Sequence, residues 1–557
     1  MSAPEVRAVR AALTADPDLG AGNVLVKLIE HGAALDGPGI TFDVDVDGHP
    51  GWQPLTLGTL RDRVAARASW LHSRGVGPRD PVAVYATSSA DILLNFMALA
   101  WLGAIPALMN GAIPGDIAAG YIQRLRGAGV IADVAHRELL RGHGLDVPVY
   151  DAAEAGTGDP GQAPAHYRHH PDDPVAITHS SGTTRVPAAV VHSHSSIFAA
   201  VRRVHLEAPA PAQAPARTLC VMPAAHAAGI INTHVALCNR YELLFLSAQG
   251  GRFPHSGAAV LDAIERWRPA VVYGFAVTWS ELARFDLAER DLSSIRMWFN
   301  TGDCAHEAHV RKLVAVGSHL AYSREKGAEL VPGSKFLDGI GSSEMGHSGF
   351  HIMHTSTSNR YGRCVGKPYG FAEIVLFDPE DGTGVPVGKV GQVGMKSPTL
   401  AVGYWNDSVA TFRTRHRGYY LTGDLMYRDD DGYYYHVDRL VDAVDLGNGN
   451  WLYTALSEER VLATCPDVRD CTVIAGRVDA GVVTDVFLVL APGADAEADR
   501  GDAVREALGG PAAATLRRIV IAADGDGNGD GDVVVGPTGK VRKFLMRQRH
   551  LAGTGGG

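Results

Sequence analysis

Short apolar segments alternate with amphipathic segments along the first three hundred residues, and this alternation limits the folds that the chain can adopt. Residues 56–75 repeat apolar side chains at helical spacing, and Thr56 can cap the start of that helix. The apolar segments PVAVYA and IPALM flank a second predicted helix, which begins near Ser89. Buried strands that alternate with helices are typical of sheets covered by helices. The sequence therefore predicts an α/β fold with largely parallel strands.

The pattern changes twice further along the chain. After about residue 360, segments such as GYYLTGDLMYRDDDGYYYHVDR are short, alternating and rich in turns, which is typical of antiparallel strands. A mixed helix and strand pattern returns from residue 439, over a length sufficient for a separate domain. We expect a large domain over 1–438, with parallel α/β sheets plus a β subdomain. A small α+β domain is expected over 439–557, and the boundary is predicted at Asp438–Asp442.

Composition excludes several classes of function. The net charge is −10, whereas proteins that bind nucleic acid or anionic membranes broadly need a basic face. The longest apolar run, residues 92–109, contains Asn95, Gly103 and Pro106, and so predicts a buried helix and strand rather than a membrane span. The six cysteines form no CxxC pair, and the N-terminus has no apolar signal sequence. We expect a cytoplasmic protein without a nucleic-acid partner or membrane span.

A turn rich in hydroxyl groups follows one predicted strand. The stretch THSSGTTRVPAAV begins at Thr178, and its backbone N–H groups and hydroxyls could hold a phosphate. It is not the GxxxxGK[ST] phosphate loop, and ordinary surface turns are also rich in Ser, Thr and Gly. This stretch alone leaves a phosphate site and a surface turn both open.

Eight segments, read together, resemble the motifs of the adenylate-forming superfamily, which comprises acyl-CoA synthetases, peptide-synthetase adenylation domains and luciferases. In chain order they are SSGTTRVPAAV, PAAHAAG, FNTGD, GIGSSE, GQVGMKSPTLAVGYW, YYLTGD, VDRLVD and GPTGKVRKFLMR. They lie between Ser180 and Arg547 and match family motifs such as TSGTTGxPKGV, YGxTE and YxTGD. The resemblance implies an enzyme that uses ATP and Mg²⁺ to activate an acid as an AMP anhydride and releases pyrophosphate.

The resemblance also implies an ATP site. Its residues would be Ser180, Ser181, Gly182, Thr183, Thr184, Arg185, Gly302, Asp303, Gly341, Ser343, Asp424 and Arg439. The hydroxyl turn would hold the β- and γ-phosphates, and Ser343 the α-phosphate. Asp424, helped by Arg439, would bind the ribose hydroxyls, because a carboxylate can accept both at once.

Further roles follow from the same resemblance. Lys540, Glu344 and Arg439 would be catalytic, with Lys540 as the mobile cation and Glu344 as the Mg²⁺ ligand. Joining an oxyanion to a triphosphate brings negative groups together, so the site must supply positive charge. His226 and Gly274 are expected in the substrate pocket. Asp442 would be the hinge of the small domain.

Several positions depart from the family pattern. Arg185 and Ala188 stand where the family has glycine and lysine, so the arginine could supply the missing charge. Ile340 replaces a tyrosine that would lie under adenine. After the hinge, Asp445 replaces a lysine and Thr454 stands near a family proline. The thiol-transfer segment therefore differs more from the family than the adenylation segments do.

Three hypotheses remain open from the sequence. The first is a ligase that activates a carboxylate and transfers it to CoA or a carrier thiol. The second is a diazotase of secondary metabolism, which adenylates nitrite and passes it to an aryl amine; the polar run with His347, His351 and His354 would suit such substrates. The third is a catalytically silent protein that binds ATP.

Overall fold

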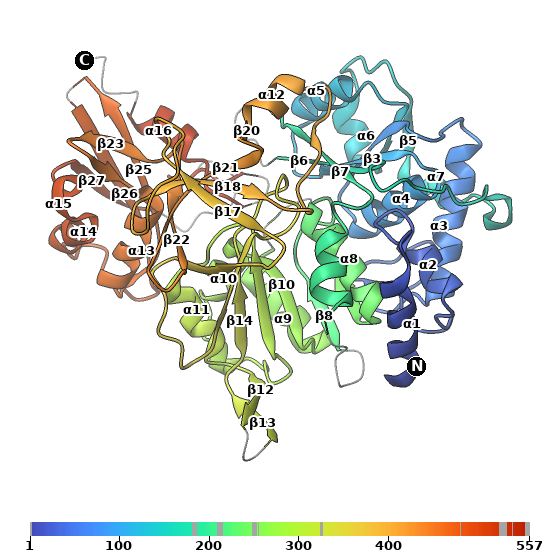
Figure 1. The fold of residues 1–557 in the computed structure, drawn as a ribbon, viewed down its shortest axis with the longest axis horizontal. Coiled ribbons are helices and arrows are strands. Elements are labelled where there is room, and N and C mark those ends of the chain that lie inside the picture. The colour runs from blue at the N-terminus through green and yellow to red at the C-terminus, as the bar shows by residue number, and fades with distance from the viewer. Residues whose placement is uncertain are drawn as a thin grey trace.

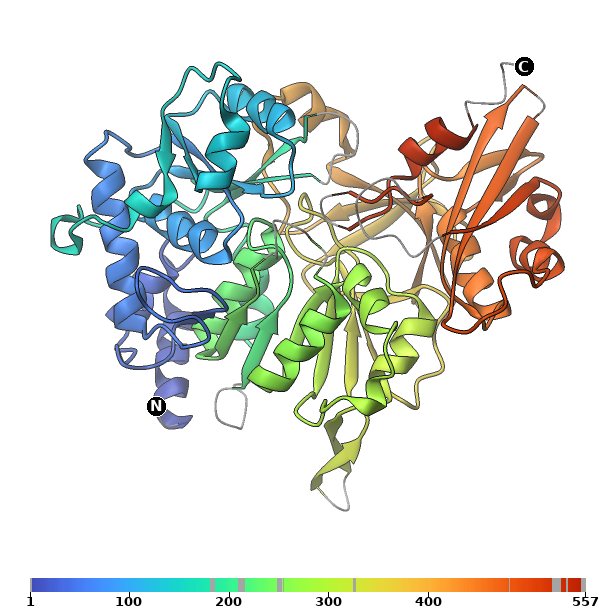
Figure 2. The same ribbon diagram turned by 180° about the vertical axis from the view of Figure 1, so that it is seen from behind.

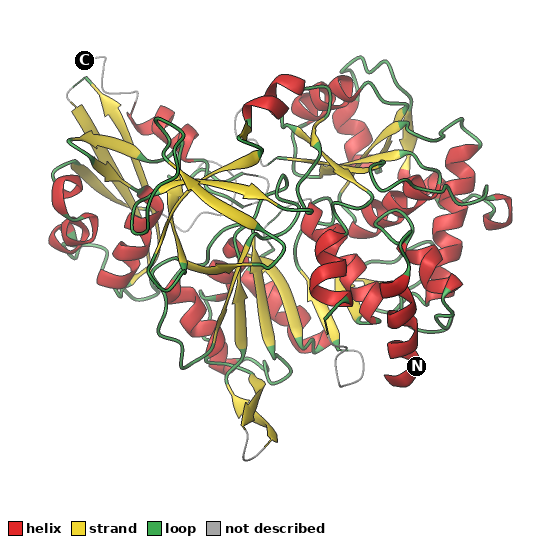
Figure 3. Cartoon of the chain, in the orientation of Figure 1, coloured by secondary structure: helices red, strands yellow, loops and turns green. Residues whose placement is uncertain are grey.

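The computed structural model describes residues 3–180, 186–208, 216–247, 253, 255–323, 327–479, 481–522, 532–536 and 539–551. Two large sheets and their helices form the N-terminal and central part of the molecule, and a smaller C-terminal unit lies at one side (Figure 1). Figure 3 shows helices packed against the sheets of the large part, as the alternating pattern predicted. The predicted fold class, α/β with a large and a small domain, is confirmed.

The first sheet has seven strands in the order β19-β7-β6-β3-β2-β4-β5. Their bounds are β2 Pro81–Ala86, β3 Ile105–Asn110, β4 Gly129–Ala132, β5 Val149–Asp151, β6 Pro174–His179, β7 Ala189–Ser193 and β19 Gly403–Tyr404. The strands from β2 to β6 pair in parallel, whereas β7 runs antiparallel to β6. β6 and β7 are therefore the strands on either side of the predicted hydroxyl turn in the sequence, and they pair with each other.

The second sheet joins a parallel half to an antiparallel half. The parallel strands are β1 Ile40–Phe42, β8 Arg217–Cys220, β9 Glu242–Phe245, β10 Val271–Phe275, β11 Met297–Thr301 and β14 Lys335–Asp338. The antiparallel strands are β15 Phe350–His354, β16 Cys364–Pro368, β17 Glu373–Phe377, β18 Gly391–Lys396, β20 Arg415–His416, β21 Tyr419–Arg428 and β22 Tyr434–Arg439. The change in sequence pattern near residue 360 marks this transition.

Helices cover these sheets, and a separate hairpin projects from the body (Figures 1 and 2). The helices are α1 Ala3–Ala15, α2 Val24–Glu30, α3 Leu57–His72, α4 Ser89–Trp101, α5 Gly115–Leu125, α6 Val134–Leu140, α7 Ala152–Ala155, α8 Ala227–Asn239, α9 Gly257–Trp267, α10 Ala276–Leu282, α11 Glu307–Val314 and α12 Ser408–Arg413. A π-helix spans Val201–Leu206. The projecting hairpin pairs β12 Ser318–Ser323 with β13 Gly327–Pro332.

The C-terminal unit has its own sheet, in the order β25-β26-β27, and its own apolar core. Its elements are β23 Val444–Gly447, β24 Asn450–Leu452, α13 Thr454–Thr464, β25 Val468–Val478, β26 Gly481–Leu490, α14 Gly501–Leu508, α15 Gly510–Ala513, β27 Leu516–Ile521 and α16 Lys543–Leu551. This mixed pattern is the small α+β domain that the sequence predicted.

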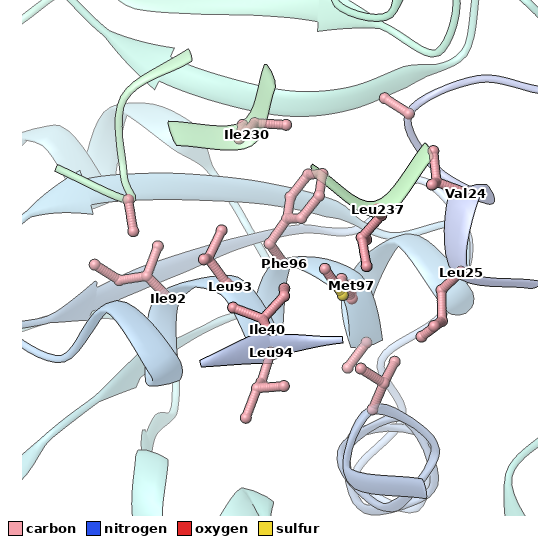
Figure 4. Close-up of a cluster of buried hydrophobic side chains, with 14 of the residues drawn as sticks. Val24, Leu25, Ile40, Ile92, Leu93, Leu94, Phe96, Met97, Ile230 and Leu237 are labelled. Carbon is pink, nitrogen blue, oxygen red and sulfur yellow. The ribbon is translucent and has the colours of Figure 1, made fainter. Parts of the chain in front are cut away.

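The longest apolar run forms a buried helix and strand, as predicted. In α4, Leu93 and Leu94 have no exposed surface, and Phe96 and Met97 belong to the same core as Leu237 of α8 (Figure 4). Fully burying such a side chain contributes about 1.5–3 kcal/mol. Ser88 caps the helix by accepting hydrogen bonds from two backbone N–H groups. Among the residues that the structure describes, no helix combines the length and apolarity needed to cross a bilayer.

Candidate functional site

Ser180, after β6, and Ala188, before β7, are joined by a pair of reciprocal hydrogen bonds. The N–H of Ser180 donates to the carbonyl of Ala188, and the N–H of Ala188 donates to Oγ of Ser180, both at 3.0 Å. The predicted phosphate ligands Ser181, Gly182, Thr183, Thr184 and Arg185 lie outside the described residues. The described part of the hairpin therefore positions only Ser180 of this set.

The turn also meets the segment that contains two further predicted residues. Oγ of Ser343 donates to the carbonyl of His179 at 3.4 Å, which joins the GIGSSE segment after β14 to the end of β6. The imidazole of His179 accepts a hydrogen bond from the N–H of Asn110, and burial lowers its pKa. Ser343 and the end of β6 are thus neighbours, although they are far apart in sequence.

Lys540 reaches the turn that follows β11. Its Nζ atom donates to the carbonyl of Gly302 at 3.2 Å. Burial lowers the pKa of Lys540, and the nearby carboxylate of Asp303 acts against that shift. Gly302 has a φ of 90°, a conformation that glycine adopts without a steric penalty. The structure therefore brings three residues of the predicted site together from the two domains.

Asp424 and Arg439 face each other across neighbouring strands. They are paired in the register of β21 and β22, and Nε of Arg439 lies 3.0 Å from Oδ1 of Asp424. Burial alone would raise the pKa of Asp424, but Arg439 and His436 outweigh it and lower that pKa. Within the described residues Oδ1 accepts no hydrogen bond, although Asp424 is only 3% exposed. The distance to Arg439 is thus an ion-pair contact, and Oδ1 keeps its capacity to accept a hydroxyl.

Glu344 is close enough to Arg439 and Lys540 for its charge to raise the pKa of both. Its Oε1 atom accepts a hydrogen bond from the hydroxyl of Tyr404 at 3.1 Å, and its carbonyl accepts one from the N–H of Ala401. Burial, and then the charge of Glu344, raise the pKa of Tyr404 well above its ordinary value. The tyrosine is therefore a neutral partner that orients the carboxylate without neutralising it.

Arg363 is a site residue that the sequence motifs did not indicate. It is 4% exposed, and its Nη2 atom lies 3.5 Å from Oδ1 of Asp303. The same atom donates to Nδ1 of His436 at 2.8 Å, and Nε donates to the carbonyl of His436 at 3.2 Å. Arg363 thus links Asp303 to β22, the strand that carries Arg439. Its sequence context, YGRCVG, matches no quoted motif, so only the tertiary structure reveals this role.

A buried polar network supports the turn at residues 302–305. Nε1 of Trp279 donates to Oδ1 of Asn300, and Nδ2 of Asn300 donates to Oδ1 of Asp338 at 2.6 Å. The other carboxylate oxygen of Asp338 accepts a hydrogen bond from the N–H of Ala305 at 3.3 Å. Burial raises the pKa of Asp338 to about 6. Fully satisfied buried networks of this kind rigidify a local structure, here the turn that Lys540 contacts.

A cavity of about 100 Å³ lies beside this turn and extends along β11, from Met297 to the carboxyl end of the strand at Thr301. Ligands commonly bind at this edge of parallel sheets. The residues that line the cavity are Val204, His205, His226, Ala227, Ala228, Ile231, Asn232, Tyr273, Met297, Phe299, Thr301, Gly302, Leu337, Gly341, Ser342, Gly346, His347, Ser348 and Tyr369. None of these described residues is Asp, Glu, Lys or Arg, so the cavity combines apolar and neutral polar side chains.

The histidines of the cavity are neutral. Burial, reinforced by the charge of Lys540, lowers the pKa of His226 to about 3. Burial likewise lowers the pKa of His205 to about 3 and that of His347 below its ordinary value. Nδ1 of His226 accepts a hydrogen bond from the N–H of Ala228, so in the neutral ring Nε2 carries the proton and can donate.

His347, which follows the GIGSSE segment, carries its proton on the opposite ring nitrogen from His226. Nδ1 of His347 lies 2.9 Å from the carbonyl of Ser348, an acceptor, so Nδ1 carries the proton and Nε2 can accept. The cavity therefore combines a donor on His226 with an acceptor on His347. His351 and His354 do not line it.

Two other predicted positions lie outside the cavity. Gly274 is within β10, and a Cβ atom there would meet the ring of Trp279 at 2.9 Å, so this glycine allows close packing of a buried tryptophan. Ile340 is 1% exposed and packs with Cys304 and Phe350 in the core of the β subdomain. Ile340 is therefore part of this apolar core.

The predicted hinge and the segment after it are well defined. Oδ1 of Asp442 accepts a hydrogen bond from Nη1 of Arg547 at 2.7 Å, and the N–H of Asp442 donates to the carbonyl of Arg439. Asp445 is exposed in the β23–β24 hairpin. The hydroxyl of Thr454 bonds the buried carboxylate of Asp438 at 3.0 Å. Asp442 thus lies three residues after Arg439, a residue of the predicted ATP site, and two residues before β23, the first strand of the C-terminal unit.

Comparisons with known proteins agree with this arrangement. The model of the family described as AMP-binding enzyme matches residues 36–405. A 3-aminoavenalumate diazotase from Streptomyces sp is 42% identical over 98% of each chain. The 4-coumarate–CoA ligase 2 of Oryza sativa subsp. japonica is 27% identical over 77% of each chain.

Solved structures share the fold at lower sequence identity. The anthranilate CoA ligase AuaEII in complex with anthranoyl-AMP has a TM-score of 0.79 at 20% identity, and the match covers 96% of this chain and 98% of that one. The O-succinylbenzoate coenzyme A synthetase from Bacillus subtilis, in complex with ATP and magnesium ion, has a TM-score of 0.72 at 19% identity, with 94% and 99% covered. The chain therefore belongs to the AMP-binding enzyme family of adenylate-forming ligases.

Proposed function

We propose that this chain binds ATP with Mg²⁺ and activates a small acid as an AMP anhydride at the junction of its two domains. The observation that carries this proposal is the convergence of Lys540, from the small domain, on the turn of Gly302 and Asp303 in the large domain. A partly buried lysine at a domain junction is costly unless negative groups oppose its desolvation. A catalytically silent ATP-binding protein would not need that arrangement.

The residues present fit a nucleotide. The buried Oδ1 of Asp424 lacks a hydrogen-bond donor among the described residues, which suits a ribose hydroxyl. Arg439 stays charged beside it, because Asp424 raises its pKa more than burial lowers it. Ser180, Ser343 and the undescribed residues 181–185 would hold the phosphates through N–H and hydroxyl groups.

Glu344 would hold the magnesium ion. A carboxylate is a hard oxygen ligand, and Mg²⁺ sites commonly combine one or two carboxylates with substrate phosphates and water. The Tyr404 hydroxyl engages one oxygen of Glu344 and so orients the group. When bound, the ion would neutralise charge on the phosphates of ATP.

The mechanism of the first half-reaction follows from these positions. An oxygen of the acid attacks the α-phosphorus of ATP, an O–P bond forms, and the bond to pyrophosphate breaks. Lys540 would donate hydrogen bonds to the oxygens on which negative charge accumulates, as electrostatic stabilisation of this kind requires. The uncharged cavity would hold the organic part of a substrate next to the Gly302 turn.

For the second half-reaction, we propose that the acid is nitrite and that the acceptor is an aryl amine. The amine nitrogen attacks the nitrosyl nitrogen, AMP leaves, and loss of water then yields the diazonium group. Identity of 42% to a diazotase over nearly the whole chain supports this proposal. The exposed Asp445, at a position where CoA ligases of the family carry lysine, is also consistent with an acceptor other than CoA.

A carboxylate and a thiol such as CoA are the second candidate pair. The anthranilate CoA ligase that holds anthranoyl-AMP shares the fold over 96% of this chain, and this similarity supports a carboxylate route. Both candidates share the adenylation step and the same nucleotide site. They differ only in the acid and in the acceptor that the cavity admits.

One set of assays, with the substrates varied in combination, distinguishes the two candidate reactions. Pyrophosphate release would be measured with nitrite plus aryl amines and, separately, with aryl carboxylates, each with and without CoA. We expect turnover with nitrite and an amine without CoA, together with a diazonium product trapped by azo coupling. Turnover that needs both a carboxylate and CoA would support the second candidate instead. Absence of pyrophosphate release in every combination, with ATP still bound, would contradict both.

A further inference from the structure

The two domains contact each other at a second place, which in the large domain lies about five residues after Gly302, the acceptor of Lys540. Glu459 of α13, in the small domain, accepts a hydrogen bond from the N–H of Glu307 at 3.0 Å through Oε1. Its Oε2 atom lies 2.6 Å from Nδ1 of His306. His306 and Glu307 begin α11 of the large domain, which lies next to α13 (Figure 1). Both carboxylate oxygens of Glu459 therefore contact residues of the large domain.

Glu459 completes the start of α11. His306 occupies the N-cap position but makes no capping hydrogen bond with its own side chain. The first N–H groups of a helix need partners, and a negative charge at that end is favoured by the helix dipole. Glu459, from the small domain, supplies both a hydrogen-bond acceptor and a negative charge at the start of α11. An N-cap residue ordinarily does this from the segment just before its own helix.

The contact is buried and charged. The side chains of His306 and Glu459 are 17% and 8% exposed. Burial would raise the pKa of Glu459, but His306 outweighs it and lowers that pKa. Burial would lower the pKa of His306, but the bond to Glu459 outweighs it and raises that pKa. A buried pair whose partners are both engaged is strongly destabilised when one partner is removed.

The same chain segment connects this contact to the catalytic lysine. Gly302, the acceptor of Lys540, and His306 are separated by three residues, and Asp338 and Asn300 hold that short segment rigid. Lys540 and Glu459, both of the small domain, thus contact the same short segment of the large domain. A rotation of the small domain would break both contacts together.

We propose that Glu459 is a positioning residue for Lys540: by binding the start of α11, it fixes the small domain in the orientation in which Lys540 reaches the Gly302 turn. This inference rests on the proposed function, in which Lys540 acts in the adenylation step. Glu459 itself touches no substrate. Two further contacts across the same junction, Ser280 with Asp470 at 2.6 Å and His309 with the carbonyl of Arg469 at 3.1 Å, accompany it.

The test compares Glu459→Gln with Glu458→Gln, its neighbour on α13. Glu458 pairs with Lys543 at 2.7 Å and accepts the N–H of Val473, both within the small domain. We expect Glu459→Gln to lower kcat of ATP–pyrophosphate exchange about tenfold with KM for ATP within about twofold. Transfer from a preformed AMP anhydride should remain within about twofold of the wild-type rate. Glu458→Gln should lower the melting temperature, but it should not lower the rate of ATP–pyrophosphate exchange selectively over the rate of transfer.

A second readout needs no substrate. Hydrogen exchange of the Glu307 amide in the unliganded protein should accelerate about tenfold in Glu459→Gln and stay at the wild-type rate in Glu458→Gln. An unchanged Glu307 amide, or equal acceleration in both variants, would overturn the inference. If the wild type shows no pyrophosphate exchange with any acid, the proposed function fails, while this amide still reports the contact between the domains.

The pH dependence of the contact has a defined sign. A histidine whose pKa is raised on folding contributes stability that is present below its ordinary value of 6.5 and is lost as pH rises through the raised value. Arg363, Asp470 and His309 also face His306, and both Arg363 and His309 oppose its charge. Protection of the Glu307 amide, relative to Glu459→Gln, should therefore decrease as pH rises above 6.5. A difference that increases with pH would contradict the ion pair.

Discussion

The two ends of the candidate site differ in how they use charge. At the nucleotide end, Asp303, Asp424, Arg439 and Lys540 influence one another's pKa values, and each is buried or close to a buried partner. The adjoining cavity holds neutral histidines and no formally charged side chain among its described residues. Gly302 and Gly341 line the cavity and also belong to the predicted ATP site. The comparison teaches that this chain concentrates charge where phosphate chemistry is proposed, and that the cavity proposed for the organic substrate offers only neutral groups among its described lining residues.

The largest expected effect concerns the lysine at the boundary between the two ends. Lys540→Ala should lower the rate of ATP–pyrophosphate exchange about 10²–10³-fold, because it removes a preorganised donor at the reacting phosphate. ATP affinity measured by calorimetry should change only slightly. Lys389→Ala, which changes an exposed lysine, is the control. An unaltered exchange rate in Lys540→Ala would remove this residue from the chemistry.

Neutralising the buried carboxylate should have a smaller effect, confined to the nucleotide end. Asp424→Asn should raise KM for ATP about 30-fold, since breaking a buried charge pair costs about 2 kcal/mol or more. A comparison of ATP with 2′-deoxy-ATP sharpens this prediction. The wild type should discriminate between the two nucleotides more strongly than the variant does. Equal discrimination would mean that Asp424 does not bind the ribose.

A change at the neutral end should leave the nucleotide unaffected. His347→Phe keeps a ring against Tyr369 but removes the acceptor that faces the cavity, so KM for the organic substrate should rise about tenfold. KM for ATP should stay within about twofold of the wild-type value. His351→Phe is the matched control, because His351 also stacks on Tyr369 but is exposed and does not line the cavity. Similar effects of both substitutions would break the distinction between the two ends.

The smallest effect is predicted for pH. Because the pKa values of His205 and His226 are lowered to about 3, both rings stay neutral at and above pH 5. KM for an uncharged organic substrate should therefore vary less than about twofold between pH 5 and 9. A titration of KM with a midpoint near 6.5 would show that a cavity histidine becomes charged. Stability should fall as pH drops below 6.5, because these rings bind protons more readily in the unfolded chain.

Much of the candidate site follows from local sequence. Ser180, Gly302, Ser343 and Asp424 stand in turns or strands that the motif resemblance placed in order, and the structure brings the described members of this set to one region. The hydroxyl turn also follows a strand, as its sequence predicted. Arg363 could not be found in this way, because its role depends on the distance to Asp303 and not on its neighbours in sequence.

The sequence by itself determined the strand and helix order, the change to antiparallel pairing and the small C-terminal domain, because these depend on local apolar periodicity and turn residues. Only the tertiary structure decided that Glu459 caps α11, that Trp279, Asn300 and Asp338 support the Gly302 turn, and that the cavity histidines are neutral. Each of these depends on burial and on partners distant in sequence, and desolvation and hydrogen bonding act through space rather than along the chain.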